Sequence, residues 1–366
     1  MRNFVRTFAF SKTLIIKHKE MKKNLLYAVA ALSVAACTTA PNTDYTVEFN
    51  TKAENEGKMV YVMDYDDGEV KLDSAIVEMG KAVFVGKIEE PRMARLLISG
   101  KRGPMFILEA GNITIDSLGT ASGSVLNDAF EAYSSVADSL HQEYDKIAKD
   151  TTAKAQQKAI VKAYGELNSA TYANNQGNPI GYYLFIQKAY EFEPAELDSV
   201  IAADSTLLKY KRVQKLVDAA NCKKETSPGY KFKDFEITHE GATKKLSDYA
   251  GKGNYTIVDF WASWCGPCIK ETKTLKEIYK KWNGKGLDIV GVAVWDEPQN
   301  TVEAIEEHKL PWNHIINGQN IPTDLYGISG IPCIVIINPE GEIVGRDVRG
   351  EDLKKFIDEK LKDFKK

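Results

Sequence analysis

Two cysteines separated by two residues are the most reactive feature of this 366-residue sequence. Cys265 and Cys268 lie in the segment Trp-Cys-Gly-Pro-Cys, directly after an apolar run and directly before a helical pattern. A cysteine at the start of a helix faces unpaired backbone N–H groups and the positive end of the helix dipole, and both favour the thiolate. Only the thiolate attacks a disulfide. The sequence therefore predicts that Cys265 is a redox nucleophile and that Cys268 can reach back to it.

The residues around the cysteines favour redox chemistry over metal binding. Gly266 and Pro267 suit the first turn of a helix, where proline loses no intrahelical hydrogen bond. A structural zinc site takes four ligands, and the sequence has no second closely spaced Cys pair. The histidines are scattered, at His18, His141, His239, His308 and His314. We therefore expect neither a metal site nor a bound cofactor.

The elements that must position the cysteines follow an alternating pattern of strands and helices. Apolar strands are expected at 255–261, 287–294, 334–337 and 342–344. Between the first two strands, apolar residues recur with helical spacing, at Leu275, Ile278, Tyr279 and Trp282. Residues 229–366 are therefore predicted to form an α/β domain with a central mixed sheet flanked by helices.

Two further regions are expected before this domain. Apolar runs broken by turn residues predict a small antiparallel β domain over residues 46–120. Residues 123–222 change to helical spacing and predict a helical region. A chain of 366 residues is long enough for two or three domains. Its formal net charge of −3 gives no electrostatic reason to expect a nucleic-acid partner.

The segment from Asp259 to Glu271, with Trp-Cys-Gly-Pro-Cys at its centre, resembles the thioredoxin superfamily. It is most similar to the extracytoplasmic TlpA/ResA-like branch, which is related to the AhpC/TSA proteins. The resemblance covers residues 230–364 and includes a second landmark, Gly-Ile-Pro, directly before a strand. It implies a thioredoxin-like fold with a cis proline against the active-site sulfurs. It also implies a substrate-binding groove at Trp264, Gly266, Pro267, Ile331 and the cis proline Pro332.

Two catalytic acids are implied by the same resemblance. Asp259 occupies the position of the buried thioredoxin carboxylate below Cys268. Burial would raise its pKa and suit it to accept the Cys268 proton. Glu271 matches a glutamate that is characteristic of the TlpA/ResA branch.

The sequence departs from the family pattern near these acids. Residues 290–294 are apolar or glycine, so the neighbouring strand offers no lysine to pair with Asp259. Thr272 stands close to a position where family members often have a proline. Cys333 stands where a hydroxyl residue is commoner, and we expect it to be a core side chain rather than a third redox thiol. The sequence leaves the state of Cys222 open.

The N-terminus has the pattern of a secretion signal. Two lysines precede an apolar run of about a dozen residues, which is too short to cross a bilayer comfortably. The run ends in Val-Ala-Ala-Cys37, which resembles the bacterial lipobox. This resemblance implies a signal region at 1–37, a lipid on Cys37 and a polar tether at 38–45. The expected location is the periplasm, anchored to the outer rather than the inner membrane. A plain signal peptide with an incidental cysteine is the alternative.

These features together predict a thiol–disulfide oxidoreductase that reduces protein disulfides. The Gly-Pro dipeptide and the isoleucine before the landmark proline resemble reducing thioredoxins. The expected partners are a disulfide-containing substrate protein and a membrane thiol protein that donates electrons. A peroxiredoxin-like thiol peroxidase is one alternative, although its cysteine normally follows Pro-x-x-x-Thr-x-x, whereas Cys265 follows Phe-Trp-Ala-Ser-Trp. A redox-silent surface lipoprotein that binds a partner is the other.

Overall fold

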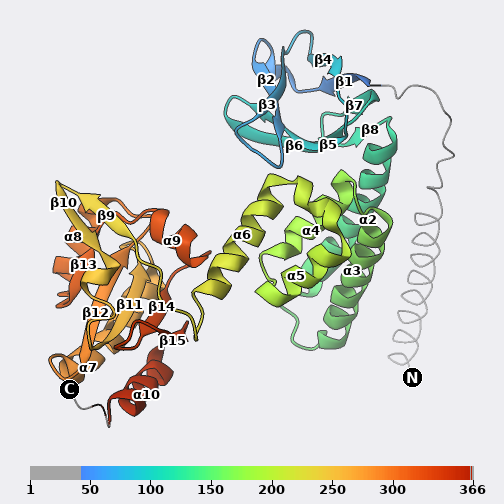
Figure 1. Cartoon of the computed structure of the whole chain (residues 1–366). Coiled ribbons are helices and arrows are strands. Elements are labelled where there is room, and N and C mark those ends of the chain that lie inside the picture. Colours follow the sequence, from blue (N-terminus) through green and yellow to red (C-terminus); the bar gives the residue numbers. More distant parts are fainter. Residues whose placement is uncertain (1–42, 363, 365–366) are drawn as a thin grey trace, which may run out of the picture. The chain divides into compact units, whose positions relative to one another are not determined.

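The computed structural model describes residues 43–362 and residue 364, so Cys37 and the expected signal region lie outside the described residues. The described chain divides into two compact units (Figure 1). Unit 1 contains residues 43–191 and 200–214, and unit 2 contains residues 192–199, 215–362 and 364. No helix in the described part of the chain is both long and apolar enough to cross a bilayer.

Two four-stranded sheets form the β region of unit 1. Their strand orders are β4-β1-β7-β8 and β3-β2-β5-β6. The pairings between these strands are antiparallel, except that β1 pairs in parallel with β7. The strands are β1 (Asp44–Asn50), β2 (Met59–Asp64), β3 (Lys71–Ile76), β4 (Lys81–Lys87), β5 (Arg92–Ile98), β6 (Lys101–Leu108), β7 (Gly111–Ile115) and β8 (Ala121–Ser122).

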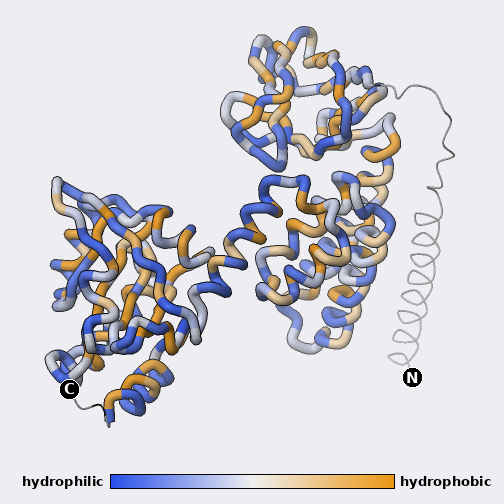
Figure 2. Tube along the Cα trace, in the orientation of Figure 1, coloured by the Kyte–Doolittle hydropathy of each residue, from blue (hydrophilic) through white to orange (hydrophobic). Residues whose placement is uncertain are grey.

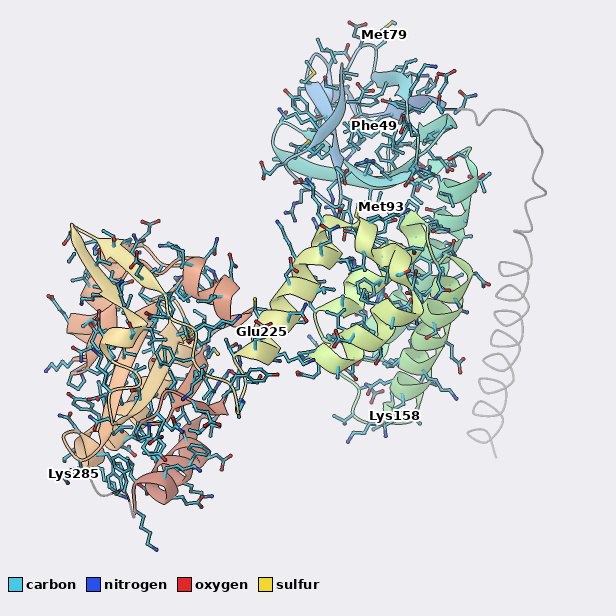
Figure 3. All side chains as sticks on the ribbon, viewed as in Figure 1. Phe49, Met79, Met93, Lys158, Glu225 and Lys285 are labelled. Atoms are coloured by element: carbon cyan, nitrogen blue, oxygen red, sulfur yellow. A yellow bond between two sulfur atoms is a disulfide. The ribbon has the colours of Figure 1, made fainter. Side chains whose placement is uncertain are left out.

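Alternation of side chains along the strands explains why the two sheets stack. Successive residues of a strand point to opposite faces, and Val47 and Phe49 of β1 are buried while their neighbours are more exposed. Val60 and Val62 of β2 follow the same pattern. The residues from both sheets meet in one apolar cluster. Figure 3 shows Phe49 inside this region and Met79, which is 92% exposed, at its periphery.

Three helices of unit 1 pack against the other face of β5 and β6. Met93 and Ile107 point away from the cluster between the sheets and join residues of α2, α3 and α4. The buried side chain of Asn127 bonds to the backbone N–H of Ile107 at 2.9 Å and to its C=O at 2.7 Å, so the helix satisfies part of an edge strand. These three helices are α2 (Val125–Ile147), α3 (Lys154–Asn174) and α4 (Pro179–Ala189), and unit 1 also has short 3-10 turns at Ala53–Asn55 and Ser205–Lys209. The next two helices, α5 (Pro194–Ala203) and α6 (Lys211–Glu225), each contain residues of both units.

Unit 2 is built on a five-stranded mixed sheet with the order β13-β12-β11-β14-β15. β11, β12 and β13 are parallel, whereas β14 pairs antiparallel with β11 and with β15. The strands are β11 (Tyr255–Trp261), β12 (Leu287–Ala293), β13 (Asn313–Ile315), β14 (Cys333–Ile337) and β15 (Ile343–Arg346), with a separate hairpin of β9 (Glu236–His239) and β10 (Ala242–Lys245). The helices are α7 (Gly266–Trp282), α8 (Pro298–Glu307), α9 (Ile321–Tyr326) and α10 (Gly350–Leu361), with a 3-10 turn at Leu246–Asp248.

Both faces of the mixed sheet are covered. In β11, Ile257 and Trp261 join a cluster with α7, α8 and α10, whereas Val258 and Phe260 join a second cluster with α9 and β9. A strand that is buried on both faces is a continuous apolar run, and Figure 2 shows apolar segments along the strands of this sheet. The predicted fold class is confirmed: a small β region and a helical region precede a thioredoxin-like α/β domain.

Gly327 marks a tight contact inside unit 2. It ends α9 in a left-handed conformation (φ 58°, ψ 43°), and a Cβ at this position would lie 2.1 Å from the carbonyl oxygen of Ala219 and 2.5 Å from the nitrogen of Lys223. Gly327→Ala is expected to lower the free energy of unfolding by about 3 kcal/mol. A non-glycine residue in the left-handed conformation costs about 1–2 kcal/mol, and the new Cβ must also displace the backbone at Ala219 and Lys223. Urea unfolding checks this value. Gly253→Ala is the control, since Gly253 has a φ of 87° but a Cβ added there would meet no atom within 4 Å. Equal losses in both variants would contradict the close-contact explanation.

Candidate active site

Cys265 lies where strand β11 leads into helix α7. It is the N-cap residue of that helix, with extended backbone angles (φ −83°, ψ 93°), and a proline occupies the first turn. The backbone N–H of Cys268 donates to the sulfur of Cys265 at 3.2 Å. In the reduced protein, this N–H group and the helix dipole would both stabilise a thiolate at Cys265.

The structure joins Cys265 and Cys268 in a disulfide, with an S–S distance of 2.05 Å and Cα atoms 5.2 Å apart. The two side chains are 4% and 1% exposed. Trp264, directly before them, is 61% exposed. The Trp264 ring is therefore accessible at the surface, whereas both cysteines are shielded from water.

The landmark proline segment lies at the start of β14. The Ile331–Pro332 peptide bond is cis, and Ile331 packs against the apolar cluster that contains both active-site cysteines. Cys333 comes next and is buried, and burial raises the pKa of its thiol to about 12. Cys333 is therefore protonated and a poor nucleophile at neutral pH. Cys222, on α6, is a half-buried free thiol.

Asp259 lies within β11 and is 2% exposed. Burial, and then the negative charge of Glu271, raise the pKa of its carboxyl to about 7, whereas Arg349 acts in the opposite direction. Its Oδ1 has no hydrogen-bond partner among the described residues. Glu271 lies on α7 and accepts a hydrogen bond from the backbone N–H of Gly350 at 2.8 Å. At neutral pH, Asp259 can therefore both accept and donate a proton.

A second buried acid, Asp296, holds the segment before the cysteines. It follows β12 and is 5% exposed. Its carboxylate accepts hydrogen bonds from the backbone N–H of Ser263 at 2.7 Å and from the hydroxyls of Ser263 and Thr301, both at 2.8 Å. Ser263 is two residues before Cys265, so Asp296 fixes the backbone directly before the cysteine pair.

The loop that carries Asp296 also orients Trp264. The indole N–H of Trp264 donates to the carbonyl oxygen of Trp295 at 2.8 Å. Trp295 has a left-handed backbone (φ 52°), and its own indole N–H donates to the side chain of Asn320 at 2.8 Å. The exposed Trp264 ring is therefore held by a chain of hydrogen bonds to two other loops.

Parts of the chain match known families and relatives. Residues 228–346 match the AhpC/TSA family, and residues 45–130 match a domain of unknown function, DUF4369. The thiol-disulfide oxidoreductase ResA of Geobacillus kaustophilus is 32% identical over 134 residues, which are 36% of this chain and 75% of that protein. The chain belongs to the TlpA/ResA-like thiol-disulfide oxidoreductases of the thioredoxin superfamily.

Other relatives of this TlpA/ResA-like chain carry similar names. The thiol-disulfide oxidoreductase ResA of Oceanobacillus iheyensis is 33% identical over 121 residues, which are 32% of this chain and 61% of its own length. The thioredoxin domain of a thiol-disulfide oxidoreductase from Bacteroides vulgatus is 32% identical, with a TM-score of 0.34 over 37% of this chain and 98% of that one. A thiol:disulfide interchange protein from Bacteroides sp. is 31% identical, with a TM-score of 0.35 over 39% and 95%.

Asp296 and Asn320 are parts of this TlpA/ResA-like site that the motif does not include. A sequence signal exists for Asp296, because it follows a buried strand that runs parallel to β11. The carboxyl ends of such neighbours meet at one edge of the sheet, where Cys265 also lies. Asn320 has no comparable signal, since its contact with Trp295 depends on the packing of a later loop.

Asp296→Asn is expected to lower the free energy of unfolding by about 1–2 kcal/mol, because the amide nitrogen cannot accept and leaves a buried donor without a partner. Urea unfolding of the oxidised protein measures this loss. Asp352→Asn is the control, since the Asp352 side chain is 85% exposed and its contact with Lys355 is 3.9 Å long. An unfolding midpoint equal to that of the control would contradict the anchoring role.

The histidines and acids of the described residues form no group of three that could hold a metal ion. His314 is buried beside Trp261 and Trp312. Burial lowers the pKa of its imidazole to about 4, so it is neutral at physiological pH.

Proposed function

We propose that the chain is a periplasmic protein-disulfide reductase that works through a Cys265/Cys268 dithiol. The observation that supports this most directly is the position of Cys265 at the N-cap of α7, with Cys268 one turn away and Ile331 packed against the apolar cluster that contains both. Membership of the thiol-disulfide oxidoreductase family supports the class of reaction.

The proposed reaction is thiol–disulfide exchange in two steps. The Cys265 thiolate attacks one sulfur of a substrate disulfide, so a new S–S bond joins enzyme and substrate, and the other substrate sulfur leaves and takes a proton. Cys268 then gives its proton to Asp259 and attacks the sulfur of Cys265. The second substrate sulfur leaves as a thiol. The substrate gains two electrons and two protons, and the enzyme is left with the Cys265–Cys268 disulfide.

The direction of the reaction depends on the reduction potential of the cysteine pair. The Gly266-Pro267 dipeptide and Ile331 are the residues that favour a reducing protein. We expect a potential nearer the roughly −270 mV of thioredoxin than the roughly −120 mV of the oxidising periplasmic type. A reductase in an oxidising compartment needs an electron donor, and we propose a membrane thiol protein. A measured potential in the oxidising range would reverse the proposed direction.

The proposed location is the periplasmic face of the outer membrane, with lipid on Cys37. That residue lies outside the described part of the chain, so the proposal rests on the lipobox resemblance. A Cys37→Ser protein is expected to lose its partition into membranes. Unchanged partition would refute the lipid anchor without affecting the redox proposal.

Insulin-disulfide reduction by the wild type and by Cys265→Ser tests the proposed function. We expect reduction by the wild type and only the background rate of free dithiol with the variant, because serine cannot form the mixed disulfide. Equal rates would favour a partner-binding lipoprotein instead. Rapid reduction of hydrogen peroxide without a protein substrate would favour a thiol peroxidase.

A further inference from the structure

Unit 1 contains a cavity with a volume of about 300 Å³ at the sheet β3-β2-β5-β6. Its lining carries three arginines, one acid and one aromatic ring, namely Arg95, Arg102, Arg212, Asp64 and Tyr65. All of these residues belong to unit 1. The lining contains no residue of unit 2, and nothing in the redox chemistry accounts for the cavity.

Two of the arginines lie on the same face of the sheet β3-β2-β5-β6. Arg95 of β5 lies opposite Met105 of β6, and Leu97 of β5 lies opposite Arg102 of β6. Residues opposite each other share a face, and so do residues two apart along a strand. The pairing has a register shift between Arg95 and Leu97, so alternation alone does not place the two arginines. Both line the same cavity, which puts Arg95 and Arg102 on one side of the sheet.

The three guanidinium groups have few acceptors. The acceptor for Arg95 is the thioether sulfur of Met105 at 2.8 Å, and a thioether is a weak acceptor. The Nε–H of Arg212 donates to the backbone carbonyl oxygen of Asp66 at 3.2 Å, and the guanidinium carbon lies 4.6 Å from the centre of the Tyr65 ring. Neither these two nor Arg102 forms an ion pair with a carboxylate of the described residues. Each guanidinium carries five N–H donors, so most of them remain available to a ligand.

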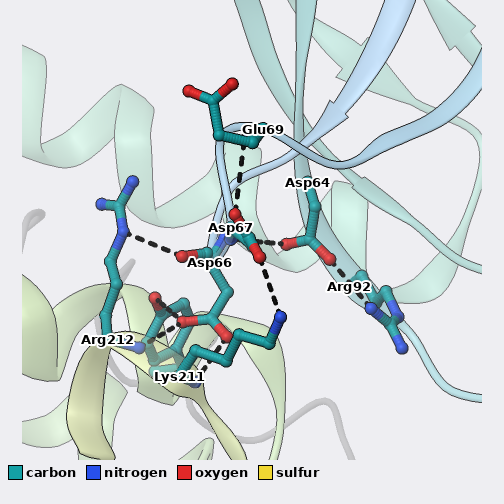
Figure 4. A network of polar contacts seen from close by, with 8 residues as sticks. Asp64, Asp66, Asp67, Glu69, Arg92, Lys211 and Arg212 are labelled. Atoms are coloured by element: carbon teal, nitrogen blue, oxygen red, sulfur yellow. Dashed lines mark hydrogen bonds and ion pairs between the residues drawn. The ribbon is translucent and has the colours of Figure 1, made fainter. Parts of the chain in front are cut away.

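The nearby acids are already engaged, as Figure 4 shows. Asp64 pairs with Arg92 at 2.8 Å. Asp66 accepts two backbone N–H groups at the start of α6, at 2.6 and 3.0 Å, and a tyrosine hydroxyl at 2.8 Å. Asp67 pairs with the ammonium group of Lys211 at 2.9 Å. Asp66 accepts only from neutral donors and lies beside Arg212, so the three carboxylates offset only part of the positive charge of Arg92, Lys211 and the three cavity arginines.

The same contacts hold Arg212 in place. Asp66 follows β2 and binds the first turn of α6, where Arg212 lies. The guanidinium of Arg212 is therefore positioned over the Tyr65 ring before any ligand arrives. A pre-positioned charged donor loses less conformational freedom on binding.

We propose that this cavity binds a small oxyanion, whose phosphate or carboxylate oxygens are held by Arg95, Arg102 and Arg212. The planar guanidinium fork matches two oxygens of either group. A cavity of about 300 Å³ suits a small molecule. The proposal is independent of the redox function, since it uses only residues of unit 1.

Isothermal titration of the purified full chain tests the site, with inorganic phosphate and with citrate as separate probes at constant ionic strength. We expect saturable binding of at least one probe, with one site per chain. Arg95→Gln and Arg102→Gln are each expected to weaken that binding by about tenfold or more, because each removes charge-assisted hydrogen bonds. Lys101→Gln is the matched control. It removes a positive charge from the neighbouring position of β6, which lies opposite Ile98 and outside the lining of the cavity. The Kd of this variant for the probe should stay within about twofold of the wild-type value, because an exposed charge contributes little.

The outcomes separate the possible ligands and test the site itself. Binding of phosphate alone identifies a phosphate site, and binding of citrate alone identifies a carboxylate site. Thermal unfolding shows whether each variant is folded, and Arg102 is exposed, so Arg102→Gln keeps the test valid if Arg95→Gln does not fold. Absence of saturable binding of both probes would overturn the proposal. So would a Kd that is the same in Arg102→Gln as in Lys101→Gln.

Discussion

Replacing Cys268 with serine is expected to stop turnover after the first exchange step and to leave the substrate covalently joined to Cys265. The serine hydroxyl cannot displace the substrate sulfur, so the mixed disulfide accumulates. Insulin reduction should fall on the order of 10³-fold or more, as when one member of a catalytic unit is removed. Non-reducing electrophoresis and mass spectrometry should show one substrate chain attached per enzyme chain, and reduction should release it.

Two comparison variants make the covalent trap specific. The double variant Cys265→Ser/Cys268→Ser should form no adduct, because it lacks the nucleophile. Cys222→Ser should turn over like the wild type, since Cys222 lies on α6 and takes no part in the active-site disulfide. Normal turnover by Cys268→Ser would show that another thiol resolves the mixed disulfide. The buried Cys333, whose pKa is raised to about 12, is poorly suited to that role.

The thioredoxin-like domain could be predicted because its central strands are apolar on both faces. Residues 255–261 correspond to β11, and the helical spacing that follows corresponds to α7. The short elements carry no such signal. β13 has three residues and α9 has six, whereas a strand pattern is recognised over about 4–8 residues and a helical pattern over about 11–18. Their positions depend on tertiary packing, as the contact of Gly327 with α6 illustrates.

The site divides in the same way into local and distant parts. The cysteine pair and the N-cap position of Cys265 are local features, so spacing alone suggested them. The cation that acts on Asp259 is Arg349, at the start of α10, and not a lysine of the neighbouring strand. Asp296 likewise reaches Ser263 from another loop. Contacts between segments so far apart in sequence need the folded backbone to bring them together.

The wild type is expected to become less stable as the pH rises from 4 to 7, and Asp259→Asn is expected to abolish this decrease. The folded-state pKa of Asp259 is raised from 3.8 to about 7, chiefly by burial. Its stabilising contribution is therefore complete when the carboxyl is protonated, below about pH 4, and is lost as the pH rises through 7. The wild type should lose up to about 4 kcal/mol across this range, at about 1.4 kcal/mol per pH unit, and the asparagine variant should not. Urea unfolding of the oxidised protein between pH 4 and pH 8 measures the difference.

The same substitution should slow catalysis. A gain in stability together with a loss of turnover distinguishes a proton acceptor from a packing residue. An amide cannot take the Cys268 proton, so turnover at pH 7 should fall by about 10²-fold or more, as for loss of a general base. If the variant has a higher free energy of unfolding above pH 7 but a lower turnover rate, then burial of this carboxyl aids the reaction and destabilises the folded protein. Asp352→Asn should keep both the wild-type pH slope and the wild-type rate, because its carboxyl is exposed. A slope that persists in Asp259→Asn would assign the titration to another group, and Glu271, whose charge acts on Asp259, is the first to test.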